Sequence, residues 1–233
     1  MDFVWVCRRG DNEELRYSIR SVLASFPDAN IWVVGGKPDW YSGNFVKTNR
    51  VTNKYAQVEE NLQRLVDNDQ ISETFVLMND DFFIVKPISS IEYFHRGSLA
   101  SAYADLVAYL GQPDLYANRL SRMLKIIISE FNIKDPLSYE LHVPMVMEKS
   151  KLATLLGKRY PMWRSFYGNK YSVGGIPIAD VKVYSHNAHA YRSFDYLNNE
   201  SAFLSTDDSS FKILQSYLHE LFPNPSKYEL DKQ

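Results

Sequence analysis

The chain has 233 residues, 45% of them hydrophobic, and its 26 basic and 28 acidic side chains nearly balance. This composition is typical of a globular domain and excludes a disordered or fibrous protein. The near-neutral charge and the lack of a long basic run also argue against a protein that mainly grips nucleic acid, so no strong nucleic-acid binding is expected.

The apolar segments are too short for a membrane span, which needs about 18 or more consecutive apolar residues. The N-terminus also lacks a basic region followed by a long apolar stretch, so a cytoplasmic protein is expected. Cys7 is the single cysteine and lies in an apolar run. It is therefore expected to be a small buried hydrophobe rather than a nucleophile.

The first part of the chain has the pattern of a β-α-β unit. An apolar run at 3–7 predicts a strand, and the capping-box pattern at 11–14 opens a helix that Pro27 ends. A second buried strand is predicted at 31–34. The glycines that follow it, Gly35 and Gly36, allow a turn or a close approach of the backbone.

The next part repeats this alternation. Val58, Leu62 and Leu65 recur at helical spacing, and apolar runs at 75–78 and 82–85 predict two more strands. Continuous apolar strands that alternate with helices are typical of parallel sheets with helices on both faces. The prediction is a three-layer α/β sandwich with a central, mostly parallel sheet.

The rest of the chain is expected to belong to the same domain, which would span 1–233. Residues 98–131 are mostly helical in pattern and are predicted to form an insertion. Residues 139–196 suggest loops and short strands that close over a site, with a helix-like segment at 147–156. A last helix is predicted at 211–221.

The sharpest local motif is Asn79-Asp80-Asp81, which lies between two strongly apolar runs. Burying a carboxylate is costly unless it is paired or bound to a cation, and ligands bind at the carboxyl ends of strands in open α/β sheets. A hard divalent cation such as Mg²⁺ or Mn²⁺, shared with the phosphates of a nucleotide, satisfies both conditions. The alternative is an ordinary surface turn, for which Asn-Asp is a common sequence.

Other candidate residues each have a structural alternative. His142 precedes Val143-Pro144 and is either a general base or a structural histidine. Arg164 is either a phosphate ligand or an arginine stacked on aromatic rings. Asp207 and Asp208 precede the last helix and are explained equally well by capping. The motifs of phosphate-loop NTPases, dinucleotide-binding proteins and serine hydrolases are absent.

Several segments, taken in order, form a more specific pattern than any one motif. They are Asp11-Asn12-Glu13-Glu14-Leu15-Arg16-Tyr17-Ser18-Ile19-Arg20-Ser21, Ile31-Trp32-Val33-Val34 with Pro38-Asp39-Trp40, the run from Phe75 through Asn79-Asp80-Asp81 to Phe83, His142-Val143-Pro144 with the later Arg164, and Asp207-Asp208 through Phe222-Pro223-Asn224-Pro225-Ser226-Lys227-Tyr228-Glu229. Their order and spacing resemble those of the Stealth family of sugar-phosphate transferases. The strand, acidic turn and strand also resemble metal-dependent glycosyltransferases of the GT-A fold.

The resemblance implies a metal-dependent transferase that moves a hexose-1-phosphate, or a hexosyl group, from a nucleotide sugar onto an acceptor hydroxyl. UDP is the expected nucleotide, and a carbohydrate or another glycosylatable macromolecule is the expected acceptor. Asp80 and Asp81 would bind Mg²⁺ or Mn²⁺. The residues with implied catalytic roles are His142 as general base, Arg164 and Asp81, and those implied to bind the donor are Arg16, Asn79, Asp207 and Asp208.

The chain departs from the family pattern in its first region, where Trp5-Val6-Cys7-Arg8-Arg9-Gly10 is short and lacks the family's acid. Asn61 and Gln63 also replace histidines that are common in the family's second region. Two alternatives therefore stay open. One is a GT-A glycosyltransferase that transfers the sugar alone to a polysaccharide, a protein or modified DNA, and the other is an inactive carbohydrate-binding module.

Overall fold

In the computed structural model, the described residues are 1–51, 53–158, 160, 162–193 and 201–230. They form two compact units. The first unit comprises Met1–Ile91, His142–Lys149 and Val181–Gln233, and the second comprises Glu92–Leu141 and Ser150–Asp180. Each unit is described separately below, and the single domain with an insertion at 98–131 stays a prediction.

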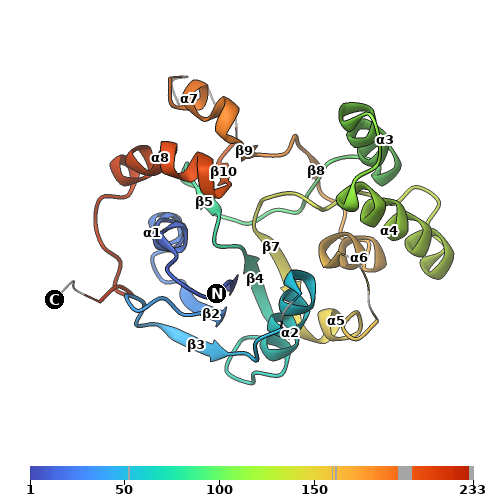
Figure 1. Cartoon of the computed structure of the whole chain (residues 1–233). Helices are drawn as coiled ribbons and strands as arrows, with labels where there is room; N and C mark the ends of the chain where they lie inside the picture. The colour runs from blue at the N-terminus through green and yellow to red at the C-terminus, as the bar shows by residue number, and fades with distance from the viewer. Residues whose placement is uncertain (52, 159, 161, 194–200, 231–233) are drawn as a thin grey trace. The chain divides into compact units, whose positions relative to one another are not determined.

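The first unit is built on a five-stranded sheet in the order β3-β2-β1-β4-β7 (Figure 1). Its strands are β1 (Asp2–Cys7), β2 (Asn30–Gly35), β3 (Asn44–Lys47), β4 (Thr74–Met78) and β7 (Met145–Glu148). The first four strands are parallel, and β7 pairs antiparallel with β4 at one edge. This confirms the predicted α/β class with a mostly parallel central sheet.

Two helices, α1 (Glu13–Ser25) and α2 (Lys54–Val66), cover this sheet. The crossover that contains α1 moves from β1 to β2, whereas the crossover that contains α2 runs back from β3 to β4. Because such connections are right-handed, opposite directions place the two helices on opposite faces. Figure 1 shows them on either side of the strands, which confirms the predicted three layers.

The run predicted as a strand at 82–85 is β5 (Phe82–Ile84), but it leaves the central sheet. It pairs antiparallel with β10 (Phe203–Thr206), which in turn pairs with β9 (Lys182–Val183). The predicted C-terminal helix is confirmed as α8 (Asp208–Leu221), and α7 (Ser185–Ser193) packs against it. A buried cluster that includes Phe83, Leu204, Phe211 and Leu214 joins these elements.

The prediction of a helix at 147–156 was wrong in its first residues. Residues 145–148 form strand β7, and only Lys149–Ala153 is helical, as α5. Methionine and glutamate favour helices, yet buried and half-buried side chains alternate along this strand. Pairing with β4 therefore overrides the intrinsic preference of these residues.

The second unit contains the predicted helical segment 98–131. Gly111, with a φ of 75°, ends α3 (Leu99–Leu110), and the side chain of Asp114 caps the start of α4 (Leu115–Phe131). The unit also contains α6 (Trp163–Lys170) and the short paired strands β6 (Phe94–His95) and β8 (Ile176–Pro177). The region 139–196 is thus more helical than predicted, and its last residues, 194–196, lie outside the described residues.

The structure gives the burial of Cys7 and the apolar character of the helices. Cys7 is buried in β1, as expected, and burial raises the pKa of its thiol well above the usual value. No helix in the described part of the chain has the length and apolar character needed to cross a membrane.

Candidate active site

Asp80 and Asp81 lie in a turn at the carboxyl end of β4, immediately before β5. Buried hydrogen bonds hold this turn: the indole of Trp5 donates to the hydroxyl of Ser18 at 2.8 Å, and that hydroxyl donates to the carbonyl of Phe82. Within the turn, the amide of Phe82 donates to the carbonyl of Asn79 at 3.3 Å. The sheet and α1 together therefore fix the position of both carboxylates.

Asp80 is tied to the start of α1. Its Oδ2 accepts a hydrogen bond of 2.6 Å from the side-chain amide Nδ2 of Asn12, which is the N-cap residue of the helix. Burial raises the pKa of Asp80, and the negative charge of Asp81 raises it further. The Asp80 carboxylate therefore lies where additional positive charge would be favourable.

Asp81 faces β9 and β10. Its Oδ2 accepts from Lys182 Nζ at 2.8 Å and from the hydroxyl of Ser205 at 3.4 Å. Its other oxygen, Oδ1, is buried and has no hydrogen-bond partner among the described residues. A buried carboxylate oxygen without a partner is costly, so this atom is suited to binding a ligand.

Glu14 brings a third carboxylate to the same place from the first turn of α1. Its side chain accepts from the hydroxyl of Thr206 at 3.2 Å and from Arg8 at 3.1 Å. Burial and the charges of Asp80 and Asp81 raise the pKa of Glu14 to about 7. The sequence places Glu14 in a capping box, but the structure uses Asn12 as the cap and turns Glu14 toward the acidic pair.

The fourth carboxylate is that of Asp208, which forms an ion pair with Arg8 at 2.8 Å. This pair lowers the pKa of Asp208. The side chain of Asp207 instead caps α8, because it accepts from the backbone amides of Ser209 and Ser210. The capping interpretation therefore fits Asp207, whereas Asp208 pairs with Arg8 next to the acidic turn.

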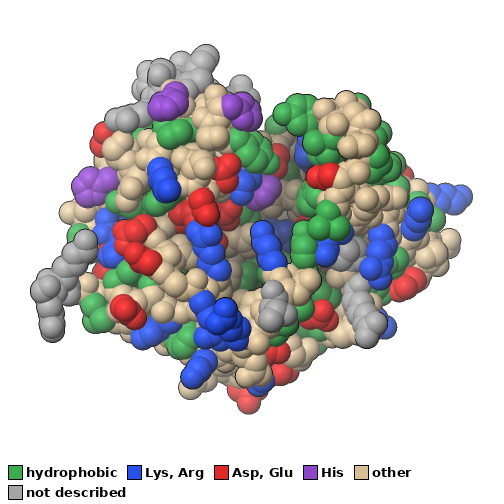
Figure 2. Space-filling model, viewed as in Figure 1, with side chains coloured by type: hydrophobic (Ala, Val, Ile, Leu, Met, Phe, Trp, Pro, Cys, Tyr) green, Lys and Arg blue, Asp and Glu red, His purple; other side chains and the backbone are tan. Residues whose placement is uncertain are grey.

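Together these side chains form what we call the carboxylate cluster, which is Glu14, Asp80, Asp81 and Asp208 with the cations Arg8 and Lys182. Figure 2 shows acidic and basic side chains side by side near the start of α8. Acids outnumber cations in the cluster, so it favours added positive charge. The described residues contain no group of three or more His, Cys, Asp or Glu that could hold a metal ion by themselves. A bound cation would therefore need further oxygen ligands, such as water or phosphate.

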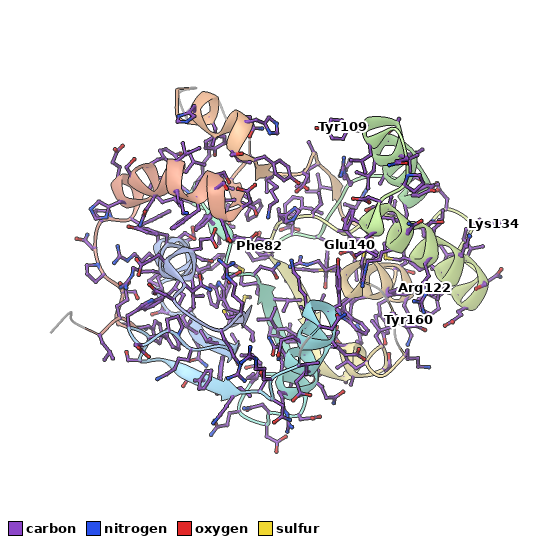
Figure 3. All side chains as sticks on the ribbon, in the orientation of Figure 1. Phe82, Tyr109, Arg122, Lys134, Glu140 and Tyr160 are labelled. Carbon is purple, nitrogen blue, oxygen red and sulfur yellow. The ribbon has the colours of Figure 1, made fainter. Side chains whose placement is uncertain are left out.

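His142 lies close to the acidic turn. It precedes β7, and its ring meets the ring of Phe82 edge-on, with centroids 6.1 Å apart. Phe82, the first residue of β5, is labelled in Figure 3. Since Phe82 directly follows Asp81, His142 lies near the acidic turn, and its role as general base stays a prediction.

The contacts of two other predicted site residues do not include the carboxylate cluster among the hydrogen bonds and ion pairs described here. Arg16 forms ion pairs with Glu13 at 3.0 Å and Glu229 at 2.6 Å, and its guanidinium stacks over Trp40. These contacts explain Arg16 without a donor, so its role in donor binding stays a prediction. Arg164 is buried in α6 of the second unit, and its catalytic role likewise stays a prediction.

Sequence reasoning did not identify Arg8, Asn12, Glu14 or Lys182 as site residues. Asn12 and Glu14 were interpreted as helix-capping residues, and Arg8 was noted only as part of a departure from the family pattern. Lys182 had no local signal, because it meets Asp81 only through the pairing of β9 with β10. The family-like segment at 11–21 was the one available indication that the start of α1 matters.

Comparison with known proteins gives one sequence relative and a group of structural neighbours, and no family model matches the chain. Two solved structures of the galactosyltransferase LgtC, one with donor and acceptor sugar analogues and one of an active-site mutant, each give a TM-score of 0.43. Their identities are 11% and 10%, and they cover 97% of this chain and 97% and 98% of their own. At this TM-score the likeness adds nothing to the description of the site.

The sequence relative is a capsular polysaccharide phosphotransferase of Neisseria meningitidis serogroup B. It is 28% identical, and the match covers 59% of this chain. The chain spans 42% of the length of that relative. This similarity confirms the resemblance to the Stealth family of sugar-phosphate transferases that the sequence motifs indicated.

Proposed function

We propose that this protein is a metal-dependent transferase that moves a hexose-1-phosphate from a nucleotide sugar onto an acceptor hydroxyl. The observation that carries the proposal is the buried Oδ1 of Asp81, which has no partner among the described residues and lies in a cluster where acids outnumber cations. Such an arrangement is suited to a divalent cation. The similarity to a polysaccharide phosphotransferase supports the type of reaction.

Asp80 and Asp81 fit a hard cation by their chemistry, because Mg²⁺ and Mn²⁺ prefer carboxylate oxygens. The structure offers two such carboxylates at the end of β4, and Asp81 Oδ1 has no hydrogen-bond partner in the part of the chain that is described. When bound, Mg²⁺ or Mn²⁺ would offset negative charge on the diphosphate of the donor. Asn12 and Lys182 keep the two carboxylates in place by hydrogen bonds at 2.6 and 2.8 Å.

His142 is the proposed general base, which takes a proton from the acceptor hydroxyl. Its position beside Phe82 supports this role, because histidine is the side chain that most often acts as a general base. Asn79 is a proposed donor contact because it belongs to the same turn. Arg164 is proposed to stabilise charge on the transferred phosphoryl group.

The two open reactions differ in the bond that breaks. Attack at the phosphorus next to the sugar releases a nucleoside monophosphate and forms a phosphodiester on the acceptor. Attack at the anomeric carbon releases a nucleoside diphosphate and forms a glycosidic bond. The relative is a phosphotransferase, which supports attack at phosphorus, and a polysaccharide acceptor is proposed on the same ground.

The test is phosphorus NMR of the protein with a panel of nucleotide sugars, oligosaccharide acceptors and Mg²⁺. We expect a nucleoside monophosphate and a phosphodiester signal to accumulate together. A nucleoside diphosphate without a phosphodiester would instead show transfer of the sugar alone. Metal-independent sugar binding without any turnover would contradict the proposal and favour a binding module.

A further inference from the structure

Arg8 connects three elements of the carboxylate cluster. Its guanidinium donates two hydrogen bonds to Asp208 at the start of α8, at 2.8 and 3.3 Å, and one of 3.1 Å to Glu14 in α1. Its Nε also lies 3.9 Å from Asp80 Oδ2. Arg8 therefore supplies positive charge directly beside the turn where the metal and the diphosphate of the donor are proposed to bind.

The two cations of the cluster are held with very different strength. The Arg8 side chain is 54% exposed and its partner Asp208 is 70% exposed. Exposed ion pairs contribute little to stability, so this one is easily exchanged. In contrast, Lys182 and Asp81 are only 15% and 17% exposed, and breaking a buried pair leaves an uncompensated charge. Arg8 is therefore the cation that can change its partner.

A diphosphate brings further negative charge to a site in which carboxylates already outnumber cations. Besides the proposed metal, a cationic side chain directed at its oxygens would favour binding, and the Lys182 ammonium is already bound to Asp81. The guanidinium of Arg8 meets the two oxygens of Asp208 in a forked arrangement. The same fork matches two oxygens of a phosphate group.

We propose that Arg8 is a ligand of the donor diphosphate, and that it exchanges the carboxylate of Asp208 for phosphate oxygens when the donor binds. This inference rests on the proposed function of the site. In the free protein the hydrogen bonds to Asp208 position the Arg8 guanidinium beside the cluster. When the donor binds, Asp208 competes with the diphosphate for this guanidinium. Asp208 is thus a positioning residue rather than a direct contact of the donor.

The test compares the binding of two probes by calorimetry, Mg²⁺–pyrophosphate and UDP with Mg²⁺. Arg8→Met should weaken binding of both probes by about tenfold, the equivalent of one charge-assisted contact. Arg8→Lys keeps the charge without the fork and should lie between Arg8→Met and the unchanged protein. Asp208→Asn should strengthen binding by about twofold to fivefold, because one charged competitor for the Arg8 guanidinium is removed.

The matched control is Arg64→Met, since Arg64 is 46% exposed and forms a surface pair with Glu60 at 3.1 Å. This variant should bind both probes as the unchanged protein does. If the unchanged protein binds UDP only with Mg²⁺ but Arg8→Met matches Arg64→Met, the role of Arg8 is overturned and the proposed function stands. Weaker binding by Asp208→Asn would overturn the exchange. If the unchanged protein binds neither probe, nor any other nucleoside diphosphate, both proposals are overturned.

Discussion

Helix α1 takes part in two groups of ion pairs, and the pKa of the central carboxylate is shifted in opposite directions in the two groups. Near the start of the helix, the carboxylate cluster has more acids than cations, and the pKa of Glu14 is raised to about 7 by burial and by the charges of Asp80 and Asp81. Further along the helix, Arg16 and Arg20 both bind the single carboxylate of Glu229, at 2.6 and 2.7 Å. Burial raises the pKa of Glu229, but hydrogen bonds from Arg20, the Ser226 amide and Arg16 lower it to about 2.

The group around Glu229 has the charge balance of a structural ion cluster, whereas the carboxylate cluster has that of a candidate ligand site. Glu229 is fully compensated and fastens the C-terminal segment to α1, and the amide of the next residue, Leu230, donates to the carbonyl of Trp40 at 2.7 Å. The carboxylate cluster retains like-charge repulsion and a buried oxygen of Asp81 without a partner among the described residues. Uncompensated charge is expected to be retained where a ligand supplies the missing partner.

The largest expected effect is on the structural cluster. Glu229 is 3% exposed, so Glu229→Gln would leave two nearly buried arginines without their shared charge. We expect the free energy of unfolding to fall by about 3–5 kcal/mol, measured by urea denaturation. Glu60→Gln removes an exposed pair on α2 and should cost at most about 1 kcal/mol. Equal losses of stability in the two variants would show that the ion pairs of Glu229 contribute no more than an exposed pair.

The next effect is a dependence of stability on pH that arises from Glu14. The raised pKa means that between about pH 4.5 and 7 the folded state keeps a proton that the unfolded state releases. The free energy of unfolding should therefore decrease as pH rises through this window, by up to about 3 kcal/mol. In Glu14→Gln this decrease should shrink, as measured by urea denaturation at several pH values in metal-free buffer. An unchanged slope in the variant would contradict the repulsion among Glu14, Asp80 and Asp81.

A smaller effect is expected for Asp80→Asn, which removes a charge but keeps an oxygen that can accept from Asn12. Relief of repulsion with Asp81 and Glu14 should raise the free energy of unfolding by about 1 kcal/mol, while metal-dependent UDP binding should be lost. Asp67→Asn, on the surface after α2, should change stability by less than about 0.5 kcal/mol and leave binding intact. A marked loss of stability in Asp80→Asn would assign Asp80 a structural role instead.

The sequence predicted the parts of the fold that have a strong local signal. Strands β1, β2 and β4 are continuous apolar runs because both faces of the sheet are covered, and such runs are recognisable without any tertiary information. Strand β7 was mistaken for helix because its Met and Glu residues have no strand preference of their own. Its pairing with β4 is a property of the whole fold.

The candidate site was predictable only in its centre. Asp80 and Asp81 stood out because two acids between apolar strands are unusual. Lys182 contacts Asp81 across 101 positions, and Arg8 contacts Asp208 across 200. Neither contact can therefore be recognised from the local sequence. Arg16 is the reverse case. It lies in a family-like segment of the sequence, but its side chain binds Glu229, 213 positions away.

Asp80 and Asp81 are proposed to form the cation-binding part of a diphosphate site. The most direct measurement is a titration with Mn²⁺, followed by electron paramagnetic resonance, in the presence and absence of UDP. We predict that Mn²⁺ is bound tightly only when UDP is present, and that Asp81→Asn abolishes this binding while Asp67→Asn does not. Tight binding of Mn²⁺ with UDP that is unchanged in Asp81→Asn would contradict the assignment of the site.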